Sequence, residues 1–136
     1  MLNDQDLERY ARQVIIPHIG EEGQEKLLTS KILVVGAGGL GAPVILYLAA
    51  AGVGHITIID DDQVSRSDLN RQIIYRDKDI DANKAKLASK AAQAINPNIQ
   101  TSHLVTRLTA GNAGRLVVAH DVIIDCSDNA CTRYLL

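Results

Sequence analysis

A glycine-rich turn between a buried strand and a helix constrains the fold of this chain more than any other segment. Residues 31–36 form a short, apolar and largely β-branched run, which is typical of a strand buried on both faces of a parallel sheet. The segment from Gly36 to Gly41 follows directly and matches G-x-G-x-x-G, and residues 39–52 are rich in Ala and Leu, as expected of a helix. A strand, a glycine turn and a helix in this order predict the start of a doubly wound α/β sheet.

The rest of the chain predicts alternating helices and strands. We expect helices over 3–16 and 20–29 before the first strand, further strands over 56–60, 99–106 and 122–126, and further helices over 81–96 and 109–119. This order predicts an α/β fold with a Rossmann-like, mostly parallel sheet in the strand order 3-2-1-4 and right-handed crossovers. Because complete sheets of this kind usually have more strands, we expect truncation after the fourth strand. Residues 1–30 are expected to form an N-terminal helical segment, and 31–136 an incomplete Rossmann-like domain.

Composition excludes several classes of protein. The 136 residues are 46% hydrophobic with a formal net charge of −2, which indicates one globular domain and argues against non-specific binding to nucleic acid or to an anionic membrane. No apolar run reaches the roughly 18 residues of a membrane helix, and the N-terminus lacks the pattern of a signal peptide. Two cysteines, Cys126 and Cys131, provide neither a disulfide framework nor a zinc site. We expect a reduced, cytoplasmic protein without a nucleic-acid or membrane partner.

The glycine turn and Asp60 predict a nucleotide site. Glycines permit close backbone approach to phosphates, and the N-terminus of the following helix supplies free N–H groups. Asp60 ends the second expected strand, where an acid accepts hydrogen bonds from ribose hydroxyls. The alternatives are an unliganded glycine turn and a solvated acidic turn, to which we assign Asp61 and Asp62. These features alone do not separate NAD from ATP.

A lysine at the start of the helix over 81–96 favours a phosphate ligand. On a helical wheel, Leu87, Ala88, Ala91 and Ile95 define the expected buried stripe, and Lys84 falls at its centre. A lysine on this side must either extend its ammonium group to solvent or meet an anion. A phosphate is the functional interpretation.

Two further charged side chains favour ATP. Arg71 lies in the long polar loop 61–79 and is a candidate phosphate clamp, although an isolated loop arginine is usually solvated. Asp128 follows the fourth strand, which should lie beside the first, so it should meet the glycine turn where the strand order reverses. A carboxylate beside phosphates is suited to holding Mg²⁺.

Other candidates have weaker patterns. Arg9 and Arg12 lie off the apolar stripe of the first expected helix, as surface charge or as arginines that reach a neighbouring subunit's site. Cys126 follows apolar residues and is expected to be a packed thiol rather than a nucleophile. The four tyrosines, Tyr10, Tyr47, Tyr75 and Tyr134, are expected to be packing residues.

Nine short motifs follow one another in a specific order. They are Arg9-Tyr10-x-Arg12-Gln13, Gly23-Gln24-x-Lys26-Leu27, Gly36-x-Gly38-Gly39-Leu40-Gly41, Ala51-Gly52-Val53-Gly54, Asp60-x-Asp62, Leu69-Asn70-Arg71-Gln72, Asn83-Lys84, Ile95-Asn96-Pro97 and Asp125-Cys126-Ser127-Asp128-Asn129. Together they resemble the ThiF/MoeB/HesA family, bacterial relatives of the ubiquitin-activating enzymes. The resemblance covers essentially the whole chain.

The resemblance implies an adenylyltransferase that uses ATP and Mg²⁺ to adenylate the C-terminal glycine of a ubiquitin-like sulfur-carrier protein, in thiamine or molybdenum-cofactor biosynthesis. It implies that Asp60 holds the ribose, that Arg71 and Lys84 contact the phosphates, and that Asp128 serves Mg²⁺. It further implies a homodimer in which Arg12 is donated across the interface, completing a catalytic set with Arg71, Lys84 and Asp128. The implied ATP site consists of Gly36, Gly38, Gly39, Gly41, Asp60, Asn70, Arg71, Lys84, Asp128 and Asn129.

One position departs from the family pattern. The family usually has Ser-Asn-Leu before x-Arg-Gln, whereas this chain has Ser67-Asp68-Leu69. An acid here should repel phosphates, which argues against a direct role of residue 68 in ATP binding. Family members are also longer, and their second half supplies much of the carrier groove and often two zinc-binding C-x-x-C pairs. We therefore expect zinc only in a longer native chain, and weak activity from this chain alone.

Three other functions remain open at this point. One is adenylation of a different carboxylate, such as that of a modified tRNA nucleoside. Another is an NAD-binding oxidoreductase domain, supported only by the glycine motif and Asp60. The third is a non-catalytic binding module that keeps the fold.

Overall fold

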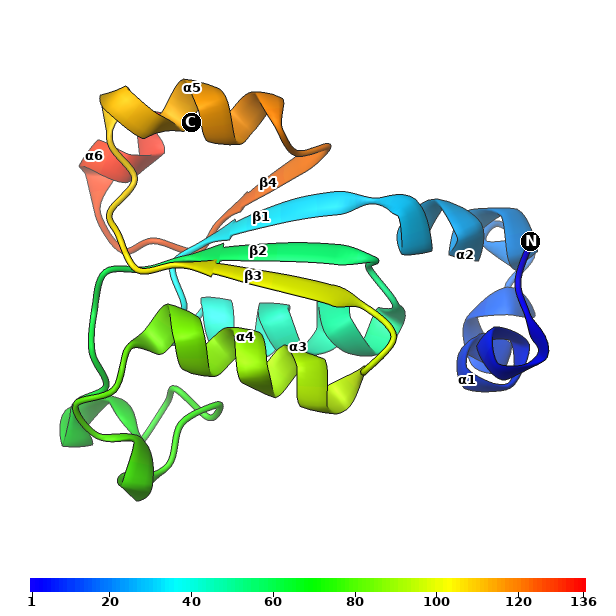
Figure 1. Cartoon of the computed structure of the whole chain (residues 1–136), viewed down its shortest axis with the longest axis horizontal. Coiled ribbons are helices and arrows are strands. Elements are labelled where there is room, and N and C mark those ends of the chain that lie inside the picture. Colours follow the sequence, from blue (N-terminus) through cyan, green and yellow to red (C-terminus); the bar gives the residue numbers. More distant parts are fainter.

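The computed structural model, which describes residues 1–136, has one four-stranded sheet with helices on both faces (Figure 1). Its strands are β1 (Lys31–Val35), β2 (His55–Ile59), β3 (Gln100–Leu104) and β4 (Val122–Asp125). They pair in the order β3-β2-β1-β4 and all three pairings are parallel. The Rossmann-like class and the predicted strand order are confirmed.

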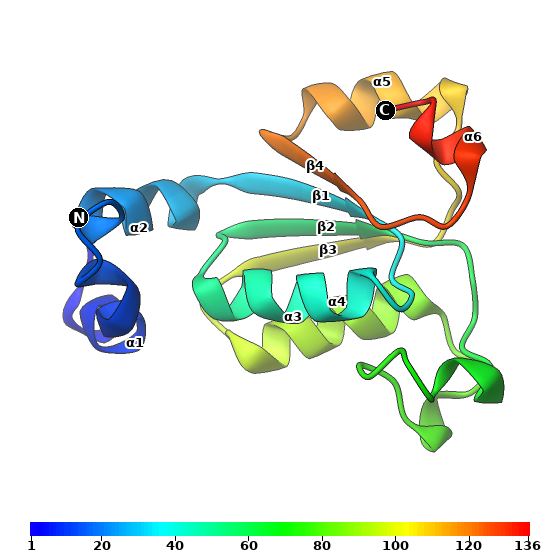
Figure 2. The same ribbon diagram turned by 180° about the vertical axis from the view of Figure 1, so that it is seen from behind.

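The helices form three groups (Figures 1 and 2). On one face lie α3 (Gly41–Ala51) and α4 (Lys84–Ile95), and on the other lie α5 (Ala110–Val118) and the short α6 (Ala130–Arg133). Beyond the amino ends of the strands lie α1 (Asp4–Val14) and α2 (Gly20–Thr29). The predicted long loop contains two single turns of 3₁₀ helix, η1 (Arg66–Asp68) and η2 (Asp77–Asp79). No helix has the length and apolar character that crossing a membrane requires.

The central strand β1 is buried on both faces, as its apolar sequence predicts. Leu33 and Val34 are fully inaccessible and point to opposite faces, because side chains alternate along a strand. Val34 belongs to a core of small and β-branched side chains beneath α3 and α4. Leu33 belongs to a second, smaller core beneath α5.

The buried face of α4 differs from the predicted one. Its fully buried apolar residues are Ala85, Ala88 and Ala92, whereas Ile95 is exposed. The helix packs against both α3 and β3, and the small alanine side chains allow close approach there. Of the residues in the predicted stripe, Ala88 is buried as expected, whereas Leu87 and Ala91 are only half-buried at the margin of this contact.

Buried amide side chains attach α1 and α2 to the rest of the fold. Asn96, after the end of α4, is fully buried, and its amide donates to the Tyr10 hydroxyl at 2.8 Å and to the Ala49 carbonyl at 2.9 Å. Gln24 of α2 is equally buried and donates to the Ala51 carbonyl. These bonds join α1 and α2 to the C-terminal ends of α3 and α4.

We expect Tyr10→Phe to lower the free energy of unfolding by about 1–2 kcal/mol, because it removes the acceptor of a buried amide N–H. Tyr47→Phe is the matched control, since Tyr47 is 77% exposed and its hydroxyl makes no hydrogen bond. Urea denaturation of both variants measures the difference. An equal effect of the two substitutions would contradict the prediction.

Candidate functional site

A cavity of about 500 Å³ opens at the carboxyl ends of the strands. It lies at the predicted nucleotide site, beside β1 and β4 at the reversal of strand order. Eight of the predicted site residues line it: Gly36, Gly38, Gly39, Asp60, Arg71, Lys84, Asp128 and Asn129.

The other predicted residues lie outside the cavity. Gly41 packs behind the turn, against Gly36. Asn70 is exposed, and its side-chain oxygen accepts a hydrogen bond from Arg71 at 3.1 Å. Arg12 is exposed on α1, at the opposite ends of the strands, and makes no hydrogen bond or ion pair within the chain.

Glycine is required at both ends of the turn for steric reasons. Gly36 has a φ of +95°, and a Cβ there would lie 2.9 Å from the carbonyl oxygen of Cys126. A Cβ on Gly41 would overlap the Gly36 carbonyl group. The turn therefore folds tightly against the end of β4, which leaves its backbone open to the cavity.

Asp60 ties the end of β2 to the glycine turn. One carboxylate oxygen accepts the Ala37 N–H at 2.7 Å and the other accepts the Asp62 N–H at 2.8 Å. Burial raises the pKa of Asp60 by more than these hydrogen bonds lower it. Because a carboxylate oxygen can accept more than one hydrogen bond, Asp60 retains capacity for a hydroxyl donor in the cavity.

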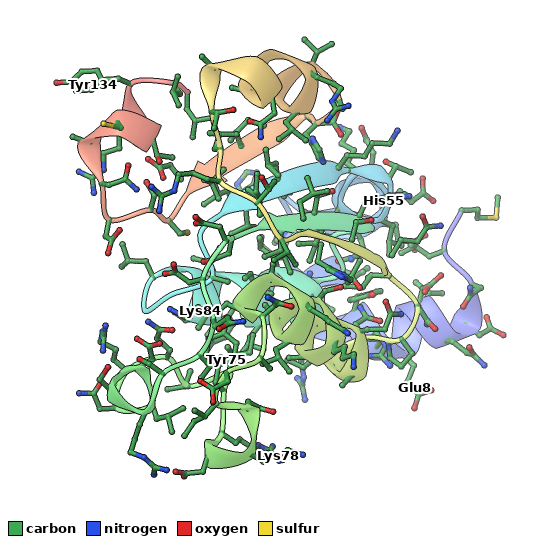
Figure 3. All side chains as sticks on the ribbon, turned by 60° about the vertical axis from the view of Figure 1, so that its left-hand side comes forward. Glu8, His55, Tyr75, Lys78, Lys84 and Tyr134 are labelled. Atoms are coloured by element: carbon green, nitrogen blue, oxygen red, sulfur yellow. The ribbon has the colours of Figure 1, made fainter.

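Tyr10 and Tyr75 are buried, as predicted, whereas the prediction is wrong for Tyr47 and Tyr134, which are exposed. Tyr75 also has a role beyond packing. Its buried hydroxyl donates to the Ala37 carbonyl at 2.7 Å and lies 3.3 Å from the Lys84 carbonyl. Burial, followed by the nearby Asp60 carboxylate, raises the pKa of the phenol, so Tyr75 remains a donor. Figure 3 shows Tyr75 and Lys84 close together beside α4, whereas Lys78 and Tyr134 point away from the protein.

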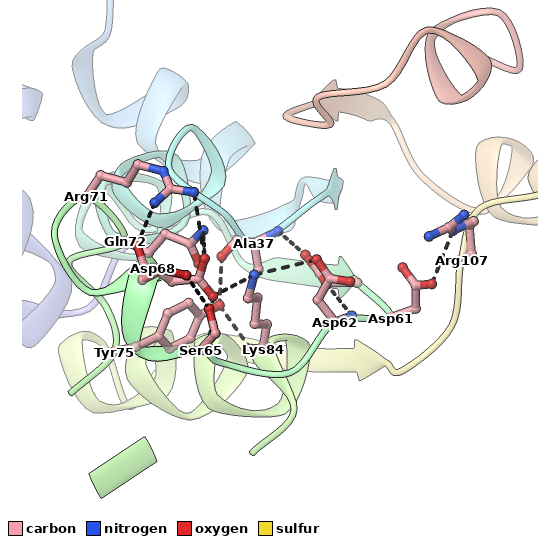
Figure 4. Close-up of polar contacts among 12 residues, drawn as sticks. Ala37, Asp61, Asp62, Ser65, Asp68, Arg71, Gln72, Tyr75, Lys84 and Arg107 are labelled. Atoms are coloured by element: carbon pink, nitrogen blue, oxygen red, sulfur yellow. Dashed lines mark hydrogen bonds and ion pairs between the residues drawn. The ribbon is translucent and has the colours of Figure 1, made fainter. Parts of the chain in front are cut away.

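Lys84 is buried, as the helical wheel predicts, and it meets an anion supplied by the protein itself. Its side chain is 6% exposed, and its ammonium nitrogen lies 3.2 Å from Asp68 and 3.5 Å from Asp62 (Figure 4). Burial raises the pKa of Asp68, but hydrogen bonds from Ser65 and the contacts with Lys84 outweigh it, so the pKa is lowered overall. Asp68 is therefore ionised at neutral pH.

Arg71 and Gln72 complete this side of the cavity. Arg71 is 58% exposed in its side chain, donates to the Ser67 carbonyl at 2.9 Å and lies 3.7 Å from Asp68. The amide nitrogen of Gln72 donates to Asp68 at 3.2 Å, and its buried oxygen has no hydrogen-bond partner. Gln72 was not predicted as a site residue, although its position next to Arg71 was an available signal.

The acidic turn after β2 is engaged with neighbouring cations. Asp60, Asp61 and Asp62 bring one oxygen each within 4.8 Å of one another. Asp61, however, pairs with Arg107 at 3.1 Å, and Asp62 faces Lys84. Arg107, which also lines the cavity, was not predicted, because no sequence pattern places the segment after β3 opposite Asp61.

Asp128 lines the cavity with a carboxylate that has no partner within the chain. It is exposed, follows β4, and makes no hydrogen bond or ion pair within the chain. An unpaired carboxylate that lines the same cavity as Lys84 and Arg71 fits Mg²⁺, which prefers oxygen ligands. Asn129 beside it accepts from the backbone and hydroxyl of Thr132 and so caps α6. Cys126 is buried, and burial raises the pKa of its thiol, consistent with a packed, unreactive cysteine.

The strand order, the glycine turn, the acid after β2 and the cations over the cavity define a Rossmann-like nucleotide-binding fold. The model of the ThiF family matches residues 10–136. This chain belongs to the ThiF family.

Curated relatives and solved structures agree with this assignment. The chain is 45% identical to a SAMP-activating enzyme E1 of Haloferax volcanii over 135 residues, covering 99% of this chain and 50% of the relative. It is also 45% identical to the sulfur carrier protein ThiS adenylyltransferase of Escherichia coli over 132 residues, covering 97% of this chain and 53% of the relative. The chain thus spans about half the length of these relatives.

A solved structure of E. coli tRNA N6-threonylcarbamoyladenosine dehydratase, TcdA, in complex with ATP has a similar fold. Its TM-score is 0.92 at 26% identity, and the match covers 100% of this chain and 56% of that one. E. coli MccB with ATP gives a TM-score of 0.71 at 28% identity, covering 83% of this chain and 35% of that one.

Proposed function

We propose that this chain forms the nucleotide-binding part of an enzyme that uses ATP to adenylate the C-terminal glycine of a ubiquitin-like sulfur-carrier protein. The observation that carries the proposal is the buried ammonium group of Lys84 at the cavity, with Arg71 and the free acid Asp128 around the same glycine turn. The names of the curated relatives, which include a ThiS adenylyltransferase, support the same chemistry.

Each residue of the proposed site contacts a different part of the nucleotide. Asp60 accepts from the ribose hydroxyls, the backbone at Gly39 lies against the nucleotide, and Lys84 and Arg71 neutralise the phosphates. Asp128 holds Mg²⁺, which supplies further positive charge to the phosphates when bound. In this assignment Lys84, Arg71 and Asp128 each meet a group of opposite charge, and Asp60 accepts from neutral hydroxyls.

The proposed reaction needs no general base. A terminal carboxylate is already ionised at neutral pH and can attack the α-phosphorus directly, with pyrophosphate as the leaving group. Catalysis then depends on alignment and on neutralising the developing charge. The cavity offers cations for this purpose and contains no Ser-His-Asp arrangement among its lining residues.

The remaining assignments concern the assembly. We propose that residues 31–136 bind ATP, that 1–30 form a helical segment attached to them, and that Arg12 acts in the site of a second subunit of a homodimer. The exposure of Arg12 and its lack of partners within the chain support this role. Both thiamine and molybdenum-cofactor synthesis are candidate pathways.

Adenylation of a modified tRNA nucleoside is a second candidate function. It is supported by the fold similarity to TcdA, which extends over the whole of this chain. Carrier protein ending in glycine, the same carrier lacking that glycine, and tRNA bearing N6-threonylcarbamoyladenosine should be compared as substrates in ATP–pyrophosphate exchange. Exchange that depends on the terminal glycine supports the carrier; exchange only with the tRNA supports the second candidate.

We expect the protein to bind ATP at least about tenfold more tightly than NAD in the presence of Mg²⁺. Lys84 and Arg71 offer two cations at the cavity, and a triphosphate carries more negative charge than the pyrophosphate of NAD. Titration calorimetry with both nucleotides measures the ratio. Tighter binding of NAD would overturn the adenylation proposal and favour an oxidoreductase domain.

A further inference from the structure

Three donors of the proposed phosphate site converge on one carboxylate. The ammonium group of Lys84 lies 3.2 Å from Asp68, a guanidinium nitrogen of Arg71 lies 3.7 Å from it, and the amide of Gln72 donates to it at 3.2 Å (Figure 4). Lys84 is 6% and Asp68 11% exposed in their side chains. Lys84, Arg71 and Gln72 all line the cavity, so one carboxylate pairs with three residues of the proposed phosphate site.

The backbone fixes the Asp68 carboxylate in this place. Asp68 ends the 3₁₀ turn η1, and its carboxylate accepts the Ser65 N–H at 3.0 Å. Its own carbonyl accepts the N–H groups of Arg71 and Gln72 at 3.1 and 2.9 Å. Asp68 therefore also fixes the backbone of two of the three residues with which its carboxylate pairs.

Gln72 shows the effect of the charge at position 68. Its amide nitrogen faces Asp68, so its oxygen is turned elsewhere and has no partner, although Gln72 is only 4% exposed. A buried acceptor without a partner is unfavourable, and it is retained here because reversing the amide would place two oxygens against each other. The Gln72 donor is thus held by Asp68 rather than offered to the cavity.

We propose that Asp68 is an internal anion that competes with the phosphates of ATP for Lys84, Arg71 and Gln72, and so sets the affinity of the site. The inference rests on the proposed function, in which Lys84 and Arg71 bind phosphates. In the free protein Asp68 compensates the buried ammonium group of Lys84. When ATP binds, the phosphates must share these donors with a carboxylate of the same charge as their own.

The test is ATP affinity in Asp68→Asn, measured by titration calorimetry with Mg²⁺. Asparagine keeps the shape and an oxygen to cap Ser65 but removes the charge. We expect about tenfold tighter binding of ATP, because one negative charge is removed beside the phosphate-binding cations. Asp77→Asn is the matched control, since Asp77 belongs to the same loop and pairs with Arg66 at 2.8 Å, away from the cavity.

Each outcome decides the inference. Tighter binding by Asp68→Asn, with the affinity of Asp77→Asn unchanged, supports it. Unchanged or weaker binding by a folded Asp68→Asn overturns it alone, as does equal tightening by Asp77→Asn, which would indicate a general effect of charge. If neither the wild type nor the Asp68→Asn and Asp77→Asn variants bind ATP detectably, the proposed function is overturned as well. Circular dichroism establishes the fold, and Asp68→Ser, also uncharged and able to cap, replaces any unfolded Asp68→Asn protein.

Discussion

Arg71→Ala is expected to lower carrier-dependent ATP–pyrophosphate exchange by about 10²–10³ while leaving the melting temperature of the protein unchanged. Removing one preorganised charge from a site of this kind has an effect of that size on rate. The fold should be insensitive, because the Arg71 side chain is 58% exposed and its hydrogen bonds and ion pair are with its own loop. Exchange should be measured in the natural protein that carries this chain.

Arg66→Ala is the matched control for Arg71→Ala. Arg66 lies in the same loop, is 78% exposed, and pairs with Asp77 outside the cavity. It should retain exchange at the wild-type rate and the same melting temperature. Exchange at the wild-type rate in Arg71→Ala would remove Arg71 from the proposed phosphate site.

Gly41→Ala is expected to destabilise the protein by about 3 kcal/mol or more and to abolish measurable ATP binding. The added Cβ would overlap the carbonyl of Gly36. Gly36 cannot move away freely, because it is held at a positive φ against the backbone of Cys126. Either α3 must shift or the turn must open, and both changes alter the backbone that borders the cavity.

Gly114→Ala tests whether the Gly41 effect is steric. Gly114 lies within α5, and a Cβ there would meet no atom within 4 Å. Alanine is the better helix former, so this variant should gain about 0.5–1 kcal/mol. Urea denaturation of both variants gives the comparison, and a Gly41→Ala protein as stable as the wild type would contradict the steric argument.

The parts of the fold with regular periodicity could be predicted from the sequence. The apolar run ending at Gly36 fixes a buried strand, and the alternation of strands and helices leaves few possible topologies. The short helix α6 was not predicted, because four residues are too few to show a period. The exposure of Ile95 was missed because hydrophobicity alone does not reveal that alanines occupy the closest helix contact.

The candidate site was predictable in outline but not in its pairings. The position of Lys84 on a helix was enough to place it on the buried side. Its pairing with Asp68 depends on the path of the irregular loop between β2 and α4, which has no periodicity to read. The departure at position 68 was visible, yet its charge was interpreted as repelling phosphates rather than as binding the cations that phosphates need.

The hydroxyl of Tyr75 makes the long loop and the glycine turn behave as one unit of local stability. It bonds the Ala37 carbonyl in the turn and lies against the Lys84 carbonyl at the first residue of α4. When the loop that carries Arg71 opens, the Tyr75 hydroxyl loses its contacts with the glycine turn and with α4. Local opening of the loop is therefore coupled to that of the glycine turn. Residues far apart along the chain therefore open together. A ligand that contacts both sides of the cavity reduces the local opening of all of them.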